Sequence, residues 1–176
     1  MSTTTLTANF SLTGSGSIFR DDFVGTVSEA TAIGSGLVPS LTRALDYGTT
    51  LNKATKWYRA SHNIAANATL SLDLTGNLID PFGNTITFAT IRAICIVNLS
   101  PARTINVGPL GVANAFFGPL KGCPQGYYEF RDWHHWVASV EYPITAGSND
   151  VYPIKNNDEV SPSGLSANVF VWILGT

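Results

Sequence analysis

Apolar and polar side chains alternate with a period of two in several segments of the chain. In residues 68–74 three leucines alternate with Thr, Ser and Asp, and residues 85–89 repeat the pattern. Because successive side chains of a strand point to opposite faces, both segments are predicted to be half-buried strands. Residues 91–97 are apolar at most consecutive positions, which predicts a central strand covered on both faces. Further short strands are predicted at residues 17–24, 56–59, 103–107, 112–117, 127–131, 133–140, 150–154 and 167–174.

Turn-forming residues separate these strands. Gly and Asn tolerate positive φ and Pro presets φ, and residues 14–16, 80–84 and 161–164 combine them. No segment has a sustained 3.6-residue apolar repeat, and only residues 27–33 and 40–45 could form a turn or two of helix. The pattern therefore predicts an all-β fold, an antiparallel β-sandwich of the jelly-roll kind.

The first 50 residues have a different pattern. They are rich in Thr, Ser and Gly, with apolar residues such as Leu6, Phe10 and Leu12 spaced among them. A segment of this kind suits an extended arm that adds a strand to a neighbouring chain. We therefore predict an N-terminal arm and lead-in over residues 1–50 and a β-sandwich body over residues 51–176.

Charged residues are unusually few. Asp, Glu, Lys and Arg make up 12% of the 176 residues, about half of the usual ~25%. Either hydroxyl and amide groups keep the surface hydrated, or much of the surface lies against other subunits. The net charge of −2 argues against binding to nucleic acid, which needs a basic face.

No targeting or membrane segment is predicted. The apolar runs are far shorter than the roughly 20 residues of a membrane-spanning helix. The N-terminus has neither the basic start nor the apolar core of a secretory signal. We expect a protein that is made in the cytoplasm and does not associate with a membrane.

No catalytic chemistry is predicted. The sequence lacks nucleotide-binding, zinc-protease, serine-hydrolase and calcium-loop motifs. Cys95 lies in an apolar run and Cys123 beside Gly and Pro, so we interpret them as a buried inert thiol and a loop thiol. The prediction is a protein with no catalytic residues, no cofactor and no metal.

Residues 127–136 form the densest group of aromatic side chains. His134 and His135 are adjacent, so on a strand they face apart, and zinc needs at least three convergent ligands. Tyr127, Trp133 and Trp136 are therefore interpreted as a candidate aromatic surface or interface. They could fill the core, bury against a subunit, or stack on the rings of a saccharide, and the sequence leaves these alternatives open.

Residues 70–98 read L-S-L-D-L-T-G-N-L-I-D-P-F-G-N-T-I-T-F-A-T-I-R-A-I-C-I-V-N. This segment resembles a family of small structural proteins of tailed bacteriophages, in which a Leu-x-Leu strand leads into an L-x-G-x-L-x-D-x-F-G-N-x-x-x-F turn and then a strand of the form h-x-h-h-h-x-N. Residues 56–59, 105–108 and 168–176 extend the resemblance more weakly. The resemblance implies a virion component with a β-sandwich fold and no catalytic residues.

Within that class we expect a capsid decoration or cement protein that stabilises a phage head through contacts between subunits. Its partners would be the major capsid protein and copies of itself, as a trimer or another symmetric oligomer, with Leu6, Phe10 and Leu12 as assembly contacts. It would be assembled in the host cytoplasm and located in the virion. The alternatives are a tail or head-tail connector protein, or a carbohydrate-binding or receptor-binding module.

Overall fold

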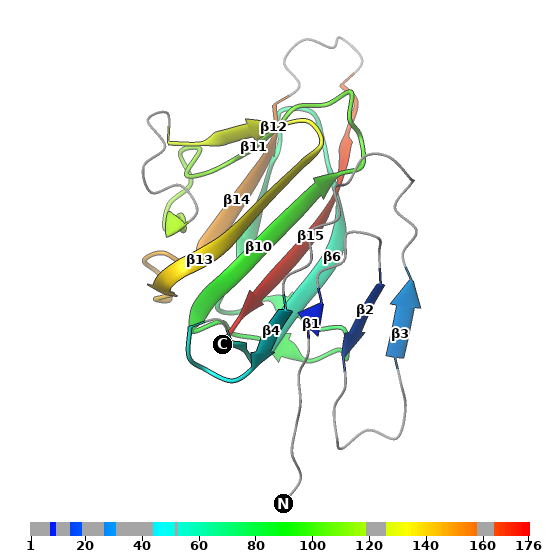
Figure 1. The fold of residues 1–176 in the computed structure, drawn as a ribbon. Coiled ribbons are helices and arrows are strands. Elements are labelled where there is room, and N and C mark those ends of the chain that lie inside the picture. Colours follow the sequence, from blue (N-terminus) through cyan, green and yellow to red (C-terminus); the bar gives the residue numbers. More distant parts are fainter. Residues whose placement is uncertain are drawn as a thin grey trace, which may run out of the picture.

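Two four-stranded antiparallel sheets form the body of the protein (Figure 1). The structure is a computed structural model that describes residues 8–9, 15–18, 27–30, 44–51, 53–118, 126–157 and 164–176. The main sheet has the order β13 (Trp133–Pro143), β10 (Thr90–Asn98), β15 (Ala167–Gly175) and β6 (Lys56–Ile64). The second sheet has the order β12 (Tyr128–Phe130), β11 (Ile105–Val107), β14 (Val151–Asn156) and β7 (Thr69–Asp73).

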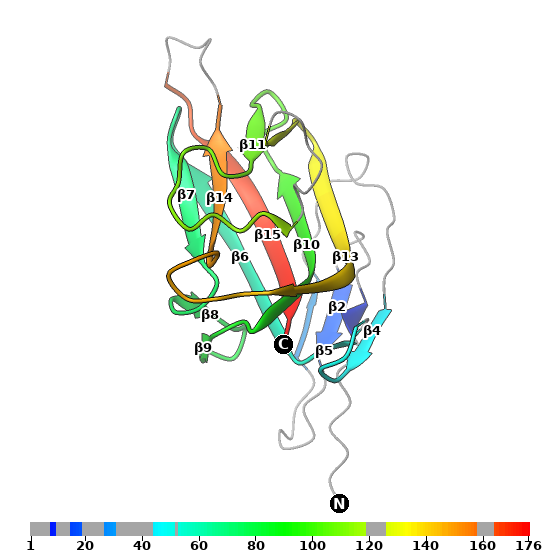
Figure 2. The same cartoon turned by 90° about the vertical axis from the view of Figure 1, so that its left-hand side faces the viewer.

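Smaller strands accompany this body. β1 (Ala8–Asn9), β4 (Ala44–Tyr47) and β5 (Lys53–Ala54) form one sheet, β2 (Ser15–Ile18) pairs with β3 (Val27–Ala30), and β8 (Leu78–Ile79) pairs with β9 (Thr85–Ile86). Figure 2 shows β2, β4 and β5 on the opposite side of the main sheet from β7 and β14. The main sheet therefore lies between the second sheet and the small N-terminal strands.

The apolar core lies between the two four-stranded sheets. Ile94 on β10 and Val171 on β15 belong to the same buried cluster as Leu72 on β7 and Ile154 on β14. Removing such side chains from water stabilises the fold by about 25 cal/mol for each Å² of apolar surface buried. The packed inner faces hold the two sheets together.

β10 is the central strand that the sequence predicts. It pairs with β13 on one side and with β15 on the other, and all its residues from Ile91 to Asn98 are buried. The register with both neighbours shifts between Ile91 and Ala93. Because this strand is covered on both faces, most of its side chains are apolar.

The all-β prediction is confirmed, since the described residues contain strands and turns but no helix. The sequence allows helical turns at residues 27–33 and 40–45, but the described parts of both segments are strands. β3 pairs with β2, and β4 pairs with β1 and β5. The strand predicted at residues 112–117 is also wrong. Leu110, Gly111 and Asn114 have positive φ values that interrupt extended backbone, and only Ala115 makes an isolated bridge.

The turn at residues 80–84 forms as predicted. The Asp80 carboxylate accepts hydrogen bonds from the backbone N–H groups of Phe82 and Asn84, both at 2.8 Å. Gly83 adopts a φ of 87°, which glycine tolerates because it has no Cβ. This turn joins β8 and β9 into a hairpin.

Candidate interaction face

The main sheet is apolar on both faces, although one face already covers the core. Alternation along β10 and β15 turns Cys95, Val97, Phe170 and Trp172 away from the second sheet, into a separate cluster with Trp133. With His135 and Arg59, which share this side of the sheet by register, these residues are called the outer aromatic face. Antiparallel sheets commonly present a polar face to solvent, whereas this second face is apolar, which makes it the candidate interaction face.

Aromatic pairs on β13 and β15 flank the smaller residues of β10. Trp133 stacks on His135 with ring centroids 4.9 Å apart, and Phe170 lies 4.1 Å from Trp172. The guanidinium of Arg59 lies 5.5 Å from the Phe170 ring, a distance at which a cation is attracted to the ring face. The outer aromatic face is thus built from side chains already held by their neighbours.

Exposure differs across this face. Cys95 and Val97 are only 5% and 2% exposed, whereas Trp133 and Trp172 are half-buried and His135 is exposed. Burial raises the pKa of the Cys95 thiol to about 12. Because the thiolate is the reactive form, we expect Cys95 to be unreactive at neutral pH. The predicted burial of this thiol is confirmed.

The two tryptophans of the candidate aromatic surface lie on opposite faces of β13. Trp133 belongs to the outer aromatic face, whereas Trp136 packs against the core with its ring centroid 6.2 Å from Phe116 and 5.0 Å from Tyr142. They are three positions apart, and an odd spacing on a strand reverses the direction of the side chain. A platform that combines both tryptophans is therefore not formed.

The remaining predicted site residues fall elsewhere. Tyr127 immediately precedes β12 and is half-buried. Leu6, Phe10 and Leu12, the candidate assembly contacts, lie outside the described residues, as does Cys123.

Sequence reasoning did not select Phe170 and Trp172 as site residues. The signal was present in β15, where these rings occupy alternate positions between Val169, Val171 and Ile173. The aliphatic residues face one side of the strand and the aromatic residues face the other. This pattern predicts a strand with apolar contacts on both faces.

His134 lies on the opposite side of β13 from His135. Its ring centroid is 5.3 Å from Tyr128 and 5.6 Å from Phe130. Burial, together with the positive charge of His135, lowers the pKa of His134 to about 4. The imidazole is therefore neutral at physiological pH and acts as a packed ring.

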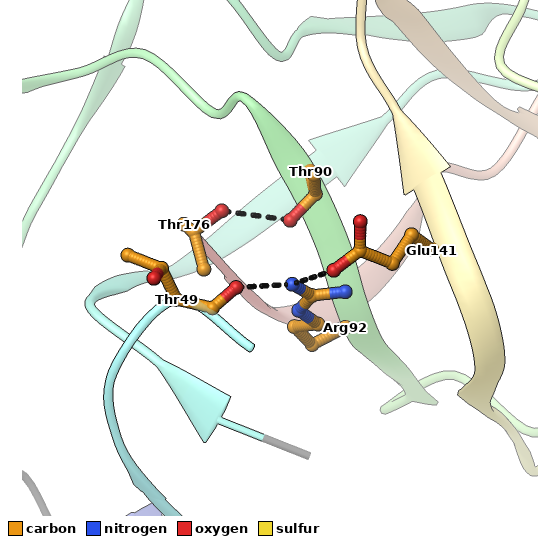
Figure 3. Close-up of polar contacts among 5 residues, drawn as sticks. All are labelled: Thr49, Thr90, Arg92, Glu141 and Thr176. Carbon is orange, nitrogen blue, oxygen red and sulfur yellow. Dashed lines mark hydrogen bonds and ion pairs between the residues drawn. The ribbon is translucent and has the colours of Figure 1, made fainter. Parts of the chain in front are cut away.

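Arg92 and Asp150 are the two buried charged residues in the described part of the chain. Figure 3 shows the Arg92 guanidinium between the carbonyl of Thr49, at 2.6 Å, and the carboxylate of Glu141, at 2.9 Å. The contact attaches the segment between β4 and β5 to the main sheet. Arg92 is thus a structural residue at the lower end of the sheet.

Within the described ranges, no three His, Cys, Asp or Glu side chains are grouped so that they could hold a metal ion. The same residues include no helix with the length and apolar character needed to cross a bilayer. Comparisons with protein-family models, with curated proteins and with solved structures find no match to the chain.

Proposed function

We propose that this chain is a structural protein of a tailed-bacteriophage virion, a capsid decoration or cement protein that stabilises the head through contacts between subunits. Its partners are the major capsid protein and copies of itself, and its place is in the virion. The observation that carries the proposal is the outer aromatic face on a sheet that already covers a core.

The strand order supports a jelly roll. With the β8-β9 hairpin set aside, the eight body strands divide into the sheets β6-β15-β10-β13 and β7-β14-β11-β12, the order of two interlocked Greek keys. Viral capsid domains and lectin domains both use this architecture. Because a fold hosts many functions, the strand order narrows the candidates and the surface must choose among them.

The surface favours an assembly role. Trp133 and Trp172 are half-buried beside the buried Val97 and Phe170, and tryptophan is enriched at the centres of protein interfaces. The low charged fraction of 12% agrees with this, since charged residues are depleted at interface cores. A head protein of this kind acts mechanically, by burying apolar surface across the junctions of capsid subunits.

The N-terminal arm is part of the proposal. β4 and β5 carry the chain onto the side of the main sheet that bears the outer aromatic face (Figure 2). An arm over residues 1–50 would therefore join the body on the side of the outer aromatic face. Adding a strand to a neighbouring chain would give it main-chain hydrogen bonds as well as side-chain contacts.

Incorporation into particles tests the function. Trp133→Ala and Trp172→Ala should reduce incorporation strongly, whereas Phe117→Ala, at a side chain 55% exposed outside the face, should not. Removal of residues 1–20 should leave the body folded and abolish incorporation. Normal incorporation of all these variants would contradict an assembly role for this face and arm.

The copy number per virion decides between head and tail. Hundreds of copies identify a shell component, as proposed. A few copies identify a tail or head-tail connector protein, the alternative within the same class.

A saccharide-binding module is the second candidate. The half-buried Trp133 ring stacks on the exposed His135, so its exposed part could contact the apolar side of a sugar ring beside a hydrogen-bonding imidazole. Glycan-array binding that is lost in Trp133→Ala and kept in Phe117→Ala would favour this function. Absence of binding to every glycan class would exclude it.

A further inference from the structure

The edge strands of the two sheets differ in how they are protected against pairing with another chain. β12 has three residues and β7 has five. β13 is long, but residues 138–141 bulge opposite Arg92, and the strand ends at Pro143. Short length, bulges, proline and charged side chains are the usual devices that prevent an edge strand from recruiting a partner.

β6 is long, contains no bulge and no proline, and carries two charged side chains, Lys56 and Arg59. Its nine residues pair with β15 in one continuous register from Lys56 to Ile64, and they include neither Pro nor Gly. Within the described part of the chain, β15 is its only strand partner. Its two cations contact their own chain, Lys56 at the carbonyl of Thr87 and Arg59 over the Phe170 ring.

The hydrogen-bonding direction of β6 follows from its neighbours. The carbonyl of Asn168 accepts the backbone N–H of Leu99, which continues β10. The backbone N–H and C=O groups of successive residues point to opposite sides of an antiparallel strand. The backbone groups of Val169 and Val171 therefore point toward β6. The backbone groups of their partners, His62 and Ala60, point toward β15. The backbone N–H and C=O groups of every second residue from Trp57 to Asn63 therefore point away from the sheet.

We propose that β6 pairs in antiparallel orientation with β6 of a second copy, about a two-fold axis at Ala60. In this register Arg59 lies opposite Ser61 of the second copy, and Tyr58 lies opposite His62. This register uses all nine residues of β6. Its hydrogen bonds are formed by the residues whose backbone N–H and C=O groups point away from the sheet. A two-fold axis at Arg59 would instead place two like charges directly opposite each other, which is unfavourable.

The pairing joins two main sheets into one continuous sheet. A two-fold axis perpendicular to the sheet keeps both outer aromatic faces on the same side, so the dimer presents one extended apolar surface. The inference concerns the isolated protein and does not require the virion role. A monomeric protein would overturn it and leave the proposed function standing, whereas failure of incorporation would leave the dimer standing.

Cross-linking of Ala60→Cys tests the axis directly. Residues opposite each other in a non-hydrogen-bonded pair have Cα atoms about 4.5 Å apart, within the ~4.4–6.8 Å that a disulfide spans. In a Cys123→Ser background, mild oxidation should convert Ala60→Cys to a covalent dimer. The matched control is Ser71→Cys on the exposed part of β7, and equal cross-linking of the two variants would overturn the proposal.

Charge substitution at Ser61 tests the register without a thiol. Ser61→Lys faces Arg59 of the second copy twice per dimer and should weaken dimerisation by about tenfold in sedimentation equilibrium. Ser61→Asp should strengthen it. Ser71→Lys and Ser71→Asp serve as controls. Identical dissociation constants for the two Ser61 variants, or a protein that is monomeric at every concentration, would overturn the pairing.

Discussion

The guanidinium of Arg92 lies 2.9 Å from the carboxylate of Glu141, at the point where β10 and β13 lose their common register. The two ends of the pair differ, since Arg92 is 1% exposed and Glu141 is 60% exposed. Nε and Nη1 of Arg92 have no acceptor among the described residues. The buried cation therefore depends on Glu141 and on the Thr49 carbonyl.

This asymmetry predicts that the two partners are not equivalent. Glu141→Gln leaves a buried charge without its counter-ion and should lower the free energy of unfolding by about 2 kcal/mol. Arg92→Met keeps the volume and removes the desolvation cost, so it should cost less than about 1 kcal/mol. Urea unfolding of the two variants measures both values. A larger loss for Arg92→Met than for Glu141→Gln would contradict this account.

The lowered pKa of His134 predicts that the protein loses stability in mild acid. This pKa is about 4 in the folded protein against about 6.5 in an unfolded chain. Below pH 6.5 the unfolded chain takes up a proton that the folded protein does not, so stability is lost as pH falls. Between pH 8 and pH 5 the loss should be about 2 kcal/mol.

Unfolding experiments at the two pH values measure this loss. His134→Phe keeps a ring between Tyr128 and Phe130 and should remove a large part of the pH dependence in that range. Burial also lowers the pKa of His62, so His62 contributes to the remainder with the same sign. His135→Gln is the control, because His135 is exposed and should leave most of it. An unchanged pH profile in His134→Phe would show that another group is responsible.

Cys95 should be chemically silent in the folded protein. Its thiol is buried and its pKa is raised to about 12. In a Cys123→Ser background, labelling by a thiol reagent at pH 8 should occur only on unfolding. The Ser71→Cys variant, with an exposed position on β7, provides the rate for an accessible thiol, and a similar rate for Cys95 would contradict its burial.

Two adjacent phenylalanines should differ sharply in their contribution to stability. Phe116 is 1% exposed and packs against Trp136, Tyr142 and Tyr152, whereas Phe117 is 55% exposed. Phe116→Ala should lower the free energy of unfolding by about 3–5 kcal/mol. Phe117→Ala should change it by less than about 0.5 kcal/mol. Thermal or urea unfolding of the two variants provides the comparison, and similar losses would contradict the packing.

The sequence by itself determined the local features. Alternation at residues 68–74 predicted β7, the apolar run at residues 91–97 predicted the central β10, and the Asp, Pro, Gly and Asn of residues 80–84 predicted a tight turn. Each of these follows from side-chain direction or from φ preferences within a few residues. It also determined that Cys95 would be buried, because that residue lies within the apolar run.

Only the tertiary structure decided which apolar residues share a surface. The odd spacing of Trp133 and Trp136 on the predicted strand already places them on opposite faces, but only the folded sheet brings Trp133 together with Phe170 and Trp172, which are far away in the sequence. The pairing of β10 with both β13 and β15 creates that face. Strand order depends on long-range burial of whole sheets, and no local pattern encodes it.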